Sequence, residues 1–284
     1  MEKIAVLVDS GSDIDLEKAK EFGIYLMPFY VNLDGKFYKE QVELKAEEFY
    51  DWIEKHEKLP KTSIPSPGEL VEKFNEIKND GYEKLIIITI SKNFTGFFNM
   101  CSQIEYDGLE IEVIDSKSVA LTSGLLAIYA KDLIKKGYEF KEIVERIEKK
   151  KKESKIFFTI DTFKYIVAGG RVPKAFGKVG EFLNIKPIVV CDPSDGKYHM
   201  VKTCRGEKKV LKEMEKLASE YLGKLDKYYM IISNGGYKKG SEILEEKLKD
   251  FKEKSSLFLT SQIAPSLGAN TGPGLFGFGF LPLD

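Results

Sequence analysis

Apolar and polar segments alternate regularly in the first half of the chain. Each of three short apolar runs is followed by a polar loop and then by a stretch whose apolar residues recur with helical spacing. Runs of this kind are typical of strands buried on both faces of a parallel sheet. We therefore predict an α/β domain with its functional loops at the carboxyl ends of the strands. The predicted strand and helix pairs are 4–8 with 16–22, 85–90 with 97–105, and 111–114 with 121–136.

The segment between the first two pairs has a less regular pattern. Residues 24–31 are expected to be extended, Asp34-Gly35 is typical of a hairpin turn, and 43–58 has helical spacing. The hydroxyl-rich stretch 61–67 contains two prolines, which are incompatible with a regular helix interior. We predict a rigid loop there.

The second half of the chain has a different pattern, in which extended runs adjoin turns. Asp195-Gly196 lies between two such runs and predicts a hairpin. We therefore predict an α+β domain with a mixed or antiparallel sheet. Its predicted elements are strands at 155–160, 185–190, 198–203, 228–233 and 256–262, helices at 208–222 and 241–251, and a glycine-rich apolar end at 268–283.

Length and charge narrow the function classes. A chain of 284 residues fits two modest domains, which we place at 1–153 and 154–284. A ligand is expected between them, and the last segment can return to that crevice. The 44 basic and 45 acidic residues leave a net charge of −1, so no general field attracts nucleic acid. No apolar run reaches the roughly 18 residues of a membrane span, and the start lacks a signal-peptide core. The expectation is a cytoplasmic protein with no nucleic-acid partner and no integral membrane association.

The sequence is poor in residues suited to metal or nucleophilic catalysis. Its three cysteines are widely spaced, and its only histidines are His56 and His199. No phosphate-binding loop is present, and the G-x-G-x-x-G match at 272–277 leaves too little chain for a dinucleotide fold. We expect no metal and no cofactor. Ser12 or Asp13 is a candidate N-cap for the helix at 16–22.

Side-chain hydroxyls recur on separate predicted loops. Thr62 and Ser63 lie on one loop, Thr95 lies beside Gly96 on another, and Thr271 follows Asn270 near the end of the chain. Each hydroxyl taken singly is explained by a hydrogen bond to its own backbone. If the fold brings them together, neutral donors with exposed backbone amides form an anion or carboxylate site.

The order and spacing of several motifs resemble the DegV family along nearly the whole chain. The better understood members of that family are fatty-acid-binding subunits of bacterial fatty acid kinase. The matching motifs are Val8-Asp9-Ser10, Lys61-Thr62-Ser63-x-Pro65-Ser66, Ser91-x-x-x-Thr95-Gly96, Val113-Ile114-Asp115-Ser116, Gly169-Gly170-Arg171-Val172, Leu183-Asn184-Ile185-Lys186-Pro187 and Gly268-x-x-x-Gly272-Pro273-Gly274.

The resemblance implies a long-chain fatty acid in a tunnel between the two domains. The residues that it assigns to the fatty-acid carboxylate are Thr62, Ser63, Thr95 and Asn270, and we add their neighbours Gly96 and Thr271 as candidates. Candidate tunnel-lining residues are Ile64, Phe94, Phe97, Leu275, Phe276 and Phe278. A surface that faces a partner, a separate ATP-dependent fatty acid kinase, is expected at Arg171, Lys174 and Arg205.

Three motifs depart from the family pattern. The usual Ser-Gly-Thr reads Thr95-Gly96-Phe97, the usual glutamine after the Thr-Ser pair is Ile64, and the usual histidine of the last loop is Asn270. Asparagine keeps an amide donor but has no proton that titrates near neutral pH. Fatty-acid affinity should therefore lack a histidine step between about pH 5.5 and 7.5.

These observations predict a carrier that is not itself an enzyme. It would bind a fatty acid and present the carboxylate to the separate kinase, which forms an acyl phosphate. One alternative is an acyl-ester hydrolase with Thr95 or Ser63 as nucleophile, although neither histidine lies in a matching loop to act as the base. The other is a regulatory or transport protein that binds a different amphipathic acid.

Overall fold

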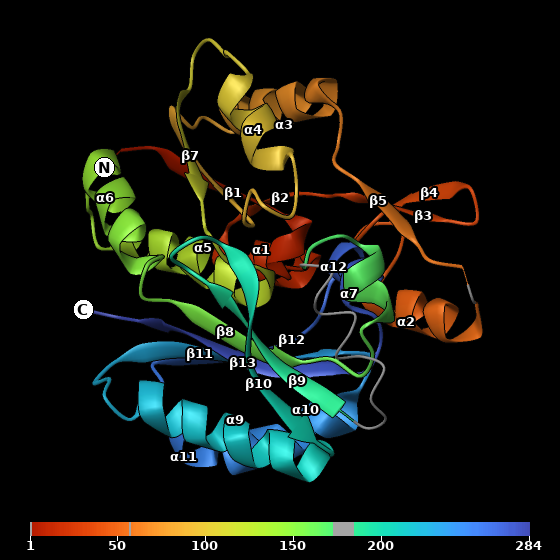
Figure 1. Ribbon diagram of the computed structural model, residues 1–284. Helices are drawn as coiled ribbons and strands as arrows, with labels where there is room; N and C mark the ends of the chain where they lie inside the picture. The colour runs from red at the N-terminus through yellow and green to blue at the C-terminus, as the bar shows by residue number, and fades with distance from the viewer. Residues whose placement is uncertain (1, 57, 173–184) are drawn as a thin grey trace.

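The computed structural model describes residues 2–56, 58–172 and 185–284, which form two main sheets with helices between and outside them (Figure 1). The elements of the first part are β1 (Ile4–Asp9), the 3-10 turn η1 (Ser10–Ser12), α1 (Leu16–Phe22), β2 (Tyr25–Met27), β3 (Tyr30–Leu33), β4 (Lys36–Lys39), α2 (Ala46–Lys55), β5 (Lys61–Ser63), α3 (Pro67–Asn79), β6 (Lys84–Thr89), α4 (Phe97–Gln103), β7 (Glu110–Asp115), α5 (Ala120–Lys135) and α6 (Phe140–Lys150). Those of the second part are β8 (Lys155–Thr159), α7 (Lys164–Ala168), β9 (Ile185–Asp192), β10 (Lys197–Arg205), α9 (Glu207–Leu222), β11 (Tyr228–Gly235), α10 (Lys238–Lys247), α11 (Lys249–Lys254), β12 (Leu257–Gln262), α12 (Pro265–Thr271) and β13 (Leu275–Pro282).

The first sheet has the strand order β2-β1-β6-β7, and every neighbouring pair is parallel. Every residue of β1 is buried, as expected for a strand covered on both faces. Helices α3 and α4 lie on one side of this sheet, and α5 lies on the other (Figure 1). The predicted parallel α/β domain is therefore confirmed.

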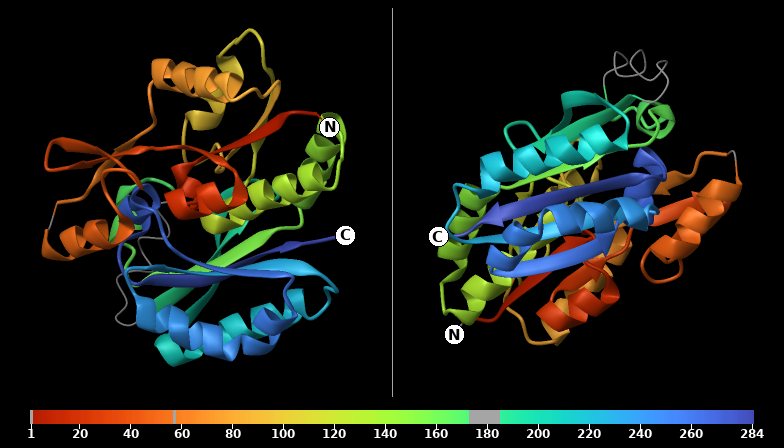
Figure 2. Two further views of the ribbon diagram at one scale, coloured as in Figure 1. Left: turned by 180° about the vertical axis from the view of Figure 1, so that it is seen from behind. Right: turned by 90° about the horizontal axis from the view of Figure 1, so that it is seen from below.

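A separate three-stranded sheet of order β4-β3-β5 forms an arm with α2, which projects away from both termini (Figure 2). The predicted turn at Asp34-Gly35 joins β3 to β4. The predicted loop at 61–67 is wrong at its start, because Lys61–Ser63 is a strand. Its backbone pairs with β3, with Thr62 opposite Val31. Pairing between distant segments, rather than local propensity, decides the conformation here.

The second sheet has the strand order β10-β9-β8-β13-β11-β12. Its pairs are antiparallel except for β11 with β12, which are parallel. The predicted mixed sheet is confirmed. The glycine-rich end of the chain forms β13 in the middle of this sheet, between β8 and β11.

Helix α5 lies between the two main sheets. It contacts β1 and β6 on one side and β11 and β13 on the other. Its sequence is apolar around most of its circumference, which suits a helix buried on all sides. Gly279 permits the close approach of β13, because a Cβ there would lie 2.1 Å from the Thr122 hydroxyl oxygen of α5. On the far face of the second sheet lie α9, α10 and α11 (Figure 1).

The two faces of β13 serve different cores. Phe276, Phe278 and Phe280 pack into a core with residues of α9 and α10. Leu275 and Leu281 belong to the larger core that surrounds α5. This separation follows from the alternation of side chains along a strand.

The predicted boundary at 153/154 falls between α6 and β8 and stays a proposal. Segment α12 belongs to the second part of the chain by sequence but contacts α2, β3 and β5 of the arm. No helix among the described residues is long and apolar enough to cross a membrane.

Candidate functional site

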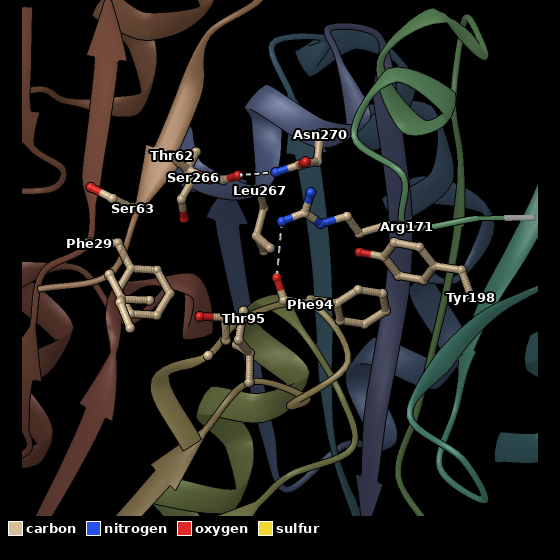
Figure 3. Close-up of a pocket in the computed structure, with 13 residues that line it drawn as sticks. Phe29, Thr62, Ser63, Phe94, Thr95, Arg171, Tyr198, Ser266, Leu267 and Asn270 are labelled. Atoms are coloured by element: carbon tan, nitrogen blue, oxygen red, sulfur yellow. Dashed lines mark hydrogen bonds between the residues drawn. The ribbon is translucent and has the colours of Figure 1, made fainter. Parts of the chain in front are cut away.

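A cavity of about 170 Å³ lies where α12, β5, the loop after β6 and the segment after α7 meet (Figure 3). We call it the outer cavity, because part of its wall is exposed. Segments from both halves of the chain therefore contribute to one site. Its lining residues are Phe29, Thr62, Ser63, Ile64, Ile90, Phe94, Thr95, Gly96, Arg171, Tyr198, Ser266, Leu267 and Asn270.

Three of the four residues whose hydroxyls were singled out in the sequence, Thr62, Ser63 and Thr95, line this cavity. Thr62 and Ser63 lie at the end of β5, and Thr95 lies in the loop between β6 and α4. The Thr95 hydroxyl oxygen accepts a hydrogen bond from the Phe97 N–H at 3.2 Å. A hydroxyl that accepts in this way still has its own hydrogen to donate. Thr95 is therefore suited to bind an anionic oxygen.

Asn270 brings an amide group from α12 to the same cavity. Its Nδ2 donates to the Ser266 carbonyl at 2.9 Å, which determines how the amide is turned. The amide oxygen lies against Gly169, where a Cβ would be only 2.5 Å away. A side chain at position 169 would therefore displace the Asn270 amide from this position. Nδ2 has a second hydrogen with which it can contact a ligand.

Arg171 is the only charged side chain among the described residues that line the outer cavity. Its guanidinium donates to the Gly169 carbonyl and, at 3.4 Å, to the Phe94 carbonyl. These contacts hold the half-buried group over the loop that carries Thr95, as Figure 3 shows. The structure thus places Arg171, which the resemblance assigns to a partner surface, in the wall of the cavity. A guanidinium inside the cavity supplies the charge that a carboxylate requires.

A second, inner cavity of about 20 Å³ lies deeper, between the second sheet and the start of α5. Tyr198 and Leu267 line both cavities and so form their common wall. The Tyr198 ring stacks on Phe94 with 4.3 Å between centroids, and burial raises the pKa of its phenol, which stays neutral. All residues that line the inner cavity are buried: Val119, Ala120, Ile156, Phe158, Tyr198, Ser233, Ile263, Leu267, Thr271, Leu275 and Gly277.

Comparison with known proteins shows to which family this chain belongs. The model of the DegV family, described as an uncharacterised protein family, matches residues 3–283. The chain belongs to the DegV family. A DegV domain-containing protein of Clostridium acetobutylicum, CA_C1624, is 30% identical over 282 residues, which are 98% of each chain.

Solved structures of other DegV proteins have the same fold. DegV from Bacillus subtilis, described as a fatty acid binding protein, is 26% identical with a TM-score of 0.90, and the match covers 100% of both chains. A stearic acid-binding protein from Eubacterium ventriosum is 24% identical with a TM-score of 0.88, and the match covers 99% of this chain and 98% of that one. The two-domain fold expected from the DegV resemblance is therefore confirmed.

The structure does not bring all predicted ligand-binding residues of this DegV protein to the outer cavity. Ile64 and Phe94 line it, and Leu275 lines the inner cavity. Thr271 also lines the inner cavity, where its hydroxyl donates to the Leu267 carbonyl at 3.1 Å. Thr271 therefore does not line the outer cavity with the other predicted carboxylate-binding residues.

Three phenylalanines predicted to line the tunnel lie elsewhere. Phe97 is fully buried and packs edge-to-face on Phe29, with 5.5 Å between centroids. Phe276 and Phe278 face the core beneath α9 and α10, on the opposite side of β13 from the inner cavity. Strand alternation explains this correction, because Leu275 and Gly277 occupy the cavity face.

The other predicted positions lie away from both cavities or outside the described residues. Lys174 belongs to the segment that is not described, and Arg205 is exposed at the end of β10. His56 stacks on Trp52, and His199 contacts Asp195 at 2.9 Å. Neither histidine lines the outer or the inner cavity. Among the described residues, no three metal-binding side chains are grouped as ligands.

Three buried carboxyl groups, those of Asp9, Asp13 and Glu40, were not predicted from the sequence as a group. Burial raises the pKa of Asp9 to about 7 and of Asp13 to about 8, and it also raises the pKa of Glu40. Asp13 is not the N-cap of α1, because Asp15 fills that role by accepting from the Lys18 N–H at 2.8 Å. Asp13 accepts instead from the Ala264 N–H at 2.8 Å, where α12 begins.

Proposed function

We propose that this DegV protein binds a long-chain fatty acid, with the carboxylate in the outer cavity and the chain directed into the inner cavity. The observation that carries this proposal is the arrangement of the two cavities. One cationic side chain and several polar donors face the outer cavity, whereas the inner cavity next to it has a largely apolar wall. An amphipathic acid has the same division into a charged end and an apolar end.

The outer cavity suits a carboxylate. Arg171 offers a guanidinium, which can donate two parallel hydrogen bonds to the two oxygens of a carboxylate. Thr62, Thr95 and Asn270 offer neutral donors from three different segments. Because Ser63 and Gly96 are exposed at the rim, a bound carboxylate would remain accessible to a second protein.

The inner cavity suits an apolar chain only if its wall moves. Its volume of about 20 Å³ is little more than one water molecule needs. Burial of a chain contributes roughly 0.8 kcal/mol per methylene, which can offset the displacement of a few side chains. Leu267 and Tyr198, at the junction of the cavities, are the side chains that must move first. The fatty-acid binding described for the Bacillus subtilis and Eubacterium ventriosum relatives supports this proposal.

We further propose that the protein carries its ligand without transforming it and presents the carboxylate to a separate ATP-dependent fatty acid kinase. This part rests on the DegV resemblance. Exposed Arg205 remains a candidate partner contact. An acyl-ester hydrolase is less well supported, because the base needed by a Thr95 or Ser63 nucleophile is not provided by a histidine at either cavity.

The test is mass spectrometry of the solvent extract of freshly purified protein, performed in parallel on the parent and Thr95→Ala. We expect a stoichiometric long-chain fatty acid in the parent and a depleted one in the variant, because a hydrogen bond to a charged group contributes about 1.5–3 kcal/mol. Thr203→Ala is the matched control, since Thr203 is exposed on β10 outside both cavities. A parent that contains no fatty acid and takes up none when it is added would refute the proposal. A bound acid of another class would favour the regulatory or transport alternative.

A further inference from the structure

A buried carboxylate connects two walls of the outer cavity. Glu40 follows β4 and is completely buried. Its Oε1 accepts hydrogen bonds from the Ser10 hydroxyl and, at 2.7 Å, from the Ser266 hydroxyl. Its Oε2 accepts from the Ser266 N–H at 2.6 Å. One side chain of the arm thus holds the end of β1 and the first turn of α12.

Both sets of contacts continue to residues that line the outer cavity. The Ser10 hydroxyl oxygen accepts from the Phe29 N–H at 2.8 Å, and Phe29 belongs to the cavity wall. Ser266 itself lines the cavity, and its carbonyl accepts from Asn270 Nδ2. Glu40 therefore reaches the ligand-binding amide through a single intervening residue.

The direction of these bonds determines which donors a ligand meets. A serine hydroxyl has one hydrogen, and Ser266 gives its hydrogen to Glu40. Ser266 consequently has none left for a carboxylate, although it lies in the cavity wall. The donors that remain in this wall are the Arg171 guanidinium, the Asn270 amide, the Tyr198 phenol and the hydroxyls of Thr62, Ser63 and Thr95.

We propose that Glu40 is a positioning residue of the carboxylate-binding groups in the outer cavity, which we call the headgroup site. By holding Ser266 and, through it, the Asn270 amide, Glu40 favours a ligand with a carboxylate. This inference rests on the proposed function, because it concerns the same cavity. Glu40 does not touch the ligand. It determines the geometry of groups that do, so its removal should affect the charged headgroup more than the chain.

Asp13 provides a matched control. It is also a completely buried carboxyl group that holds the start of α12, through the Ala264 N–H at 2.8 Å and the Ser261 hydroxyl at 3.3 Å. Neither Ala264 nor Ser261 lines the outer cavity. Loss of Asp13 therefore disturbs the same helix end without a direct connection to Asn270.

The experiment compares Glu40→Gln with Asp13→Asn by measuring the dissociation constants of hexadecanoic acid and hexadecanol, which share a chain and differ in headgroup. We expect Glu40→Gln to weaken acid binding by about tenfold, the equivalent of one charged hydrogen bond, and alcohol binding by less than about threefold. Asp13→Asn should change both constants by the same factor. If Glu40→Gln does not fold, Ser266→Ala removes the same hydroxyl contact and should lower the acid preference in the same direction.

The possible failures are distinguishable. A parent that binds neither compound refutes the proposed function and this inference with it. A parent that prefers the acid, with a preference unchanged in Glu40→Gln and Ser266→Ala, refutes the inference alone. Equal weakening of acid and alcohol in Glu40→Gln would show that Glu40 stabilises the fold but does not position the headgroup site.

Discussion

The charge of Arg171 should account for much of the affinity of this DegV protein for a fatty-acid carboxylate. Arg171→Met tests this, because methionine keeps an apolar stem of similar reach and removes the guanidinium. The group is half-buried, and the Gly169 and Phe94 carbonyls already hold it in the cavity. A ligand carboxylate would therefore meet a positioned cation, and little side-chain entropy would be lost on binding.

The expected magnitude follows from one charge-assisted interaction. A hydrogen bond to a charged group contributes about 1.5–3 kcal/mol, which corresponds to a roughly 10- to 150-fold weaker binding of hexadecanoic acid in Arg171→Met. Because the site is partly open to solvent, the lower half of this range is expected. Binding of hexadecanol should change little, since it carries no charge.

The assay is competitive displacement of a fluorescent fatty acid at low and high salt. Affinity of the parent for the acid should decrease with salt more than that of the variant, because screening weakens an attraction that only the parent has. Arg205→Met is the control, since Arg205 is exposed on β10 away from the cavities. An acid-to-alcohol preference in Arg171→Met equal to that of the parent would refute the assignment of Arg171 to the carboxylate site.

Three other expectations concern the buried acids, the cavity junction and the histidines. The folded-state pKa of Asp13 is raised to about 8, so the folded protein keeps a proton that the unfolded chain loses above about pH 4, and the free energy of unfolding should decrease as pH rises from 5 to 8. In Asp13→Asn, the free energy of unfolding measured by chemical denaturation should decrease less steeply with pH, by up to about 1.4 kcal/mol per pH unit. The same pH dependence in the variant and the parent would contradict the raised pKa. Leu267→Ala should join the two cavities, and it should accelerate fatty-acid uptake in stopped-flow fluorescence while lowering thermal stability. An unchanged association rate would argue against a junction that must open. The pH profile of fatty-acid affinity should be the same in the parent and in a His56→Gln/His199→Gln variant, because both histidines are exposed outside the cavities. A pH-dependent step that is present in the parent and absent from the variant would contradict this expectation.

Several features of the fold were predictable because their causes are local. A strand buried on both faces must be continuously apolar, and Ile4–Asp9 and Lys84–Thr89 are recognisable for that reason. The turn at Asp34-Gly35 was equally clear. In contrast, Lys61–Ser63 became a strand only through its pairing with β3, and nothing in those three residues requires it.

The sequence of the final strand, β13, contains a pattern that indicates which of its side chains share a face. Phenylalanine and glycine alternate from Phe276 to Phe280, with the period of a strand that has one bulky and one small face. That alternation separates Phe276 and Phe278 from Gly277 and could have shown that they do not line the same surface. Which face meets the ligand depends on the position of α5, which the strand sequence does not specify.

The sequence by itself determined the parallel and mixed sheets, the DegV relationship and the hydroxyls of Thr62 and Thr95 as candidate ligands. These follow from hydrophobic periodicity and from motifs that are contiguous in the chain. The tertiary structure alone decided that Arg171 enters the cavity, that Asp13 holds the start of α12 instead of capping α1, and that Glu40 also holds α12. The physical reason is that a buried carboxyl group must be satisfied by whichever donors the packed fold places beside it, and the donors at the start of α12 lie more than two hundred residues away in sequence.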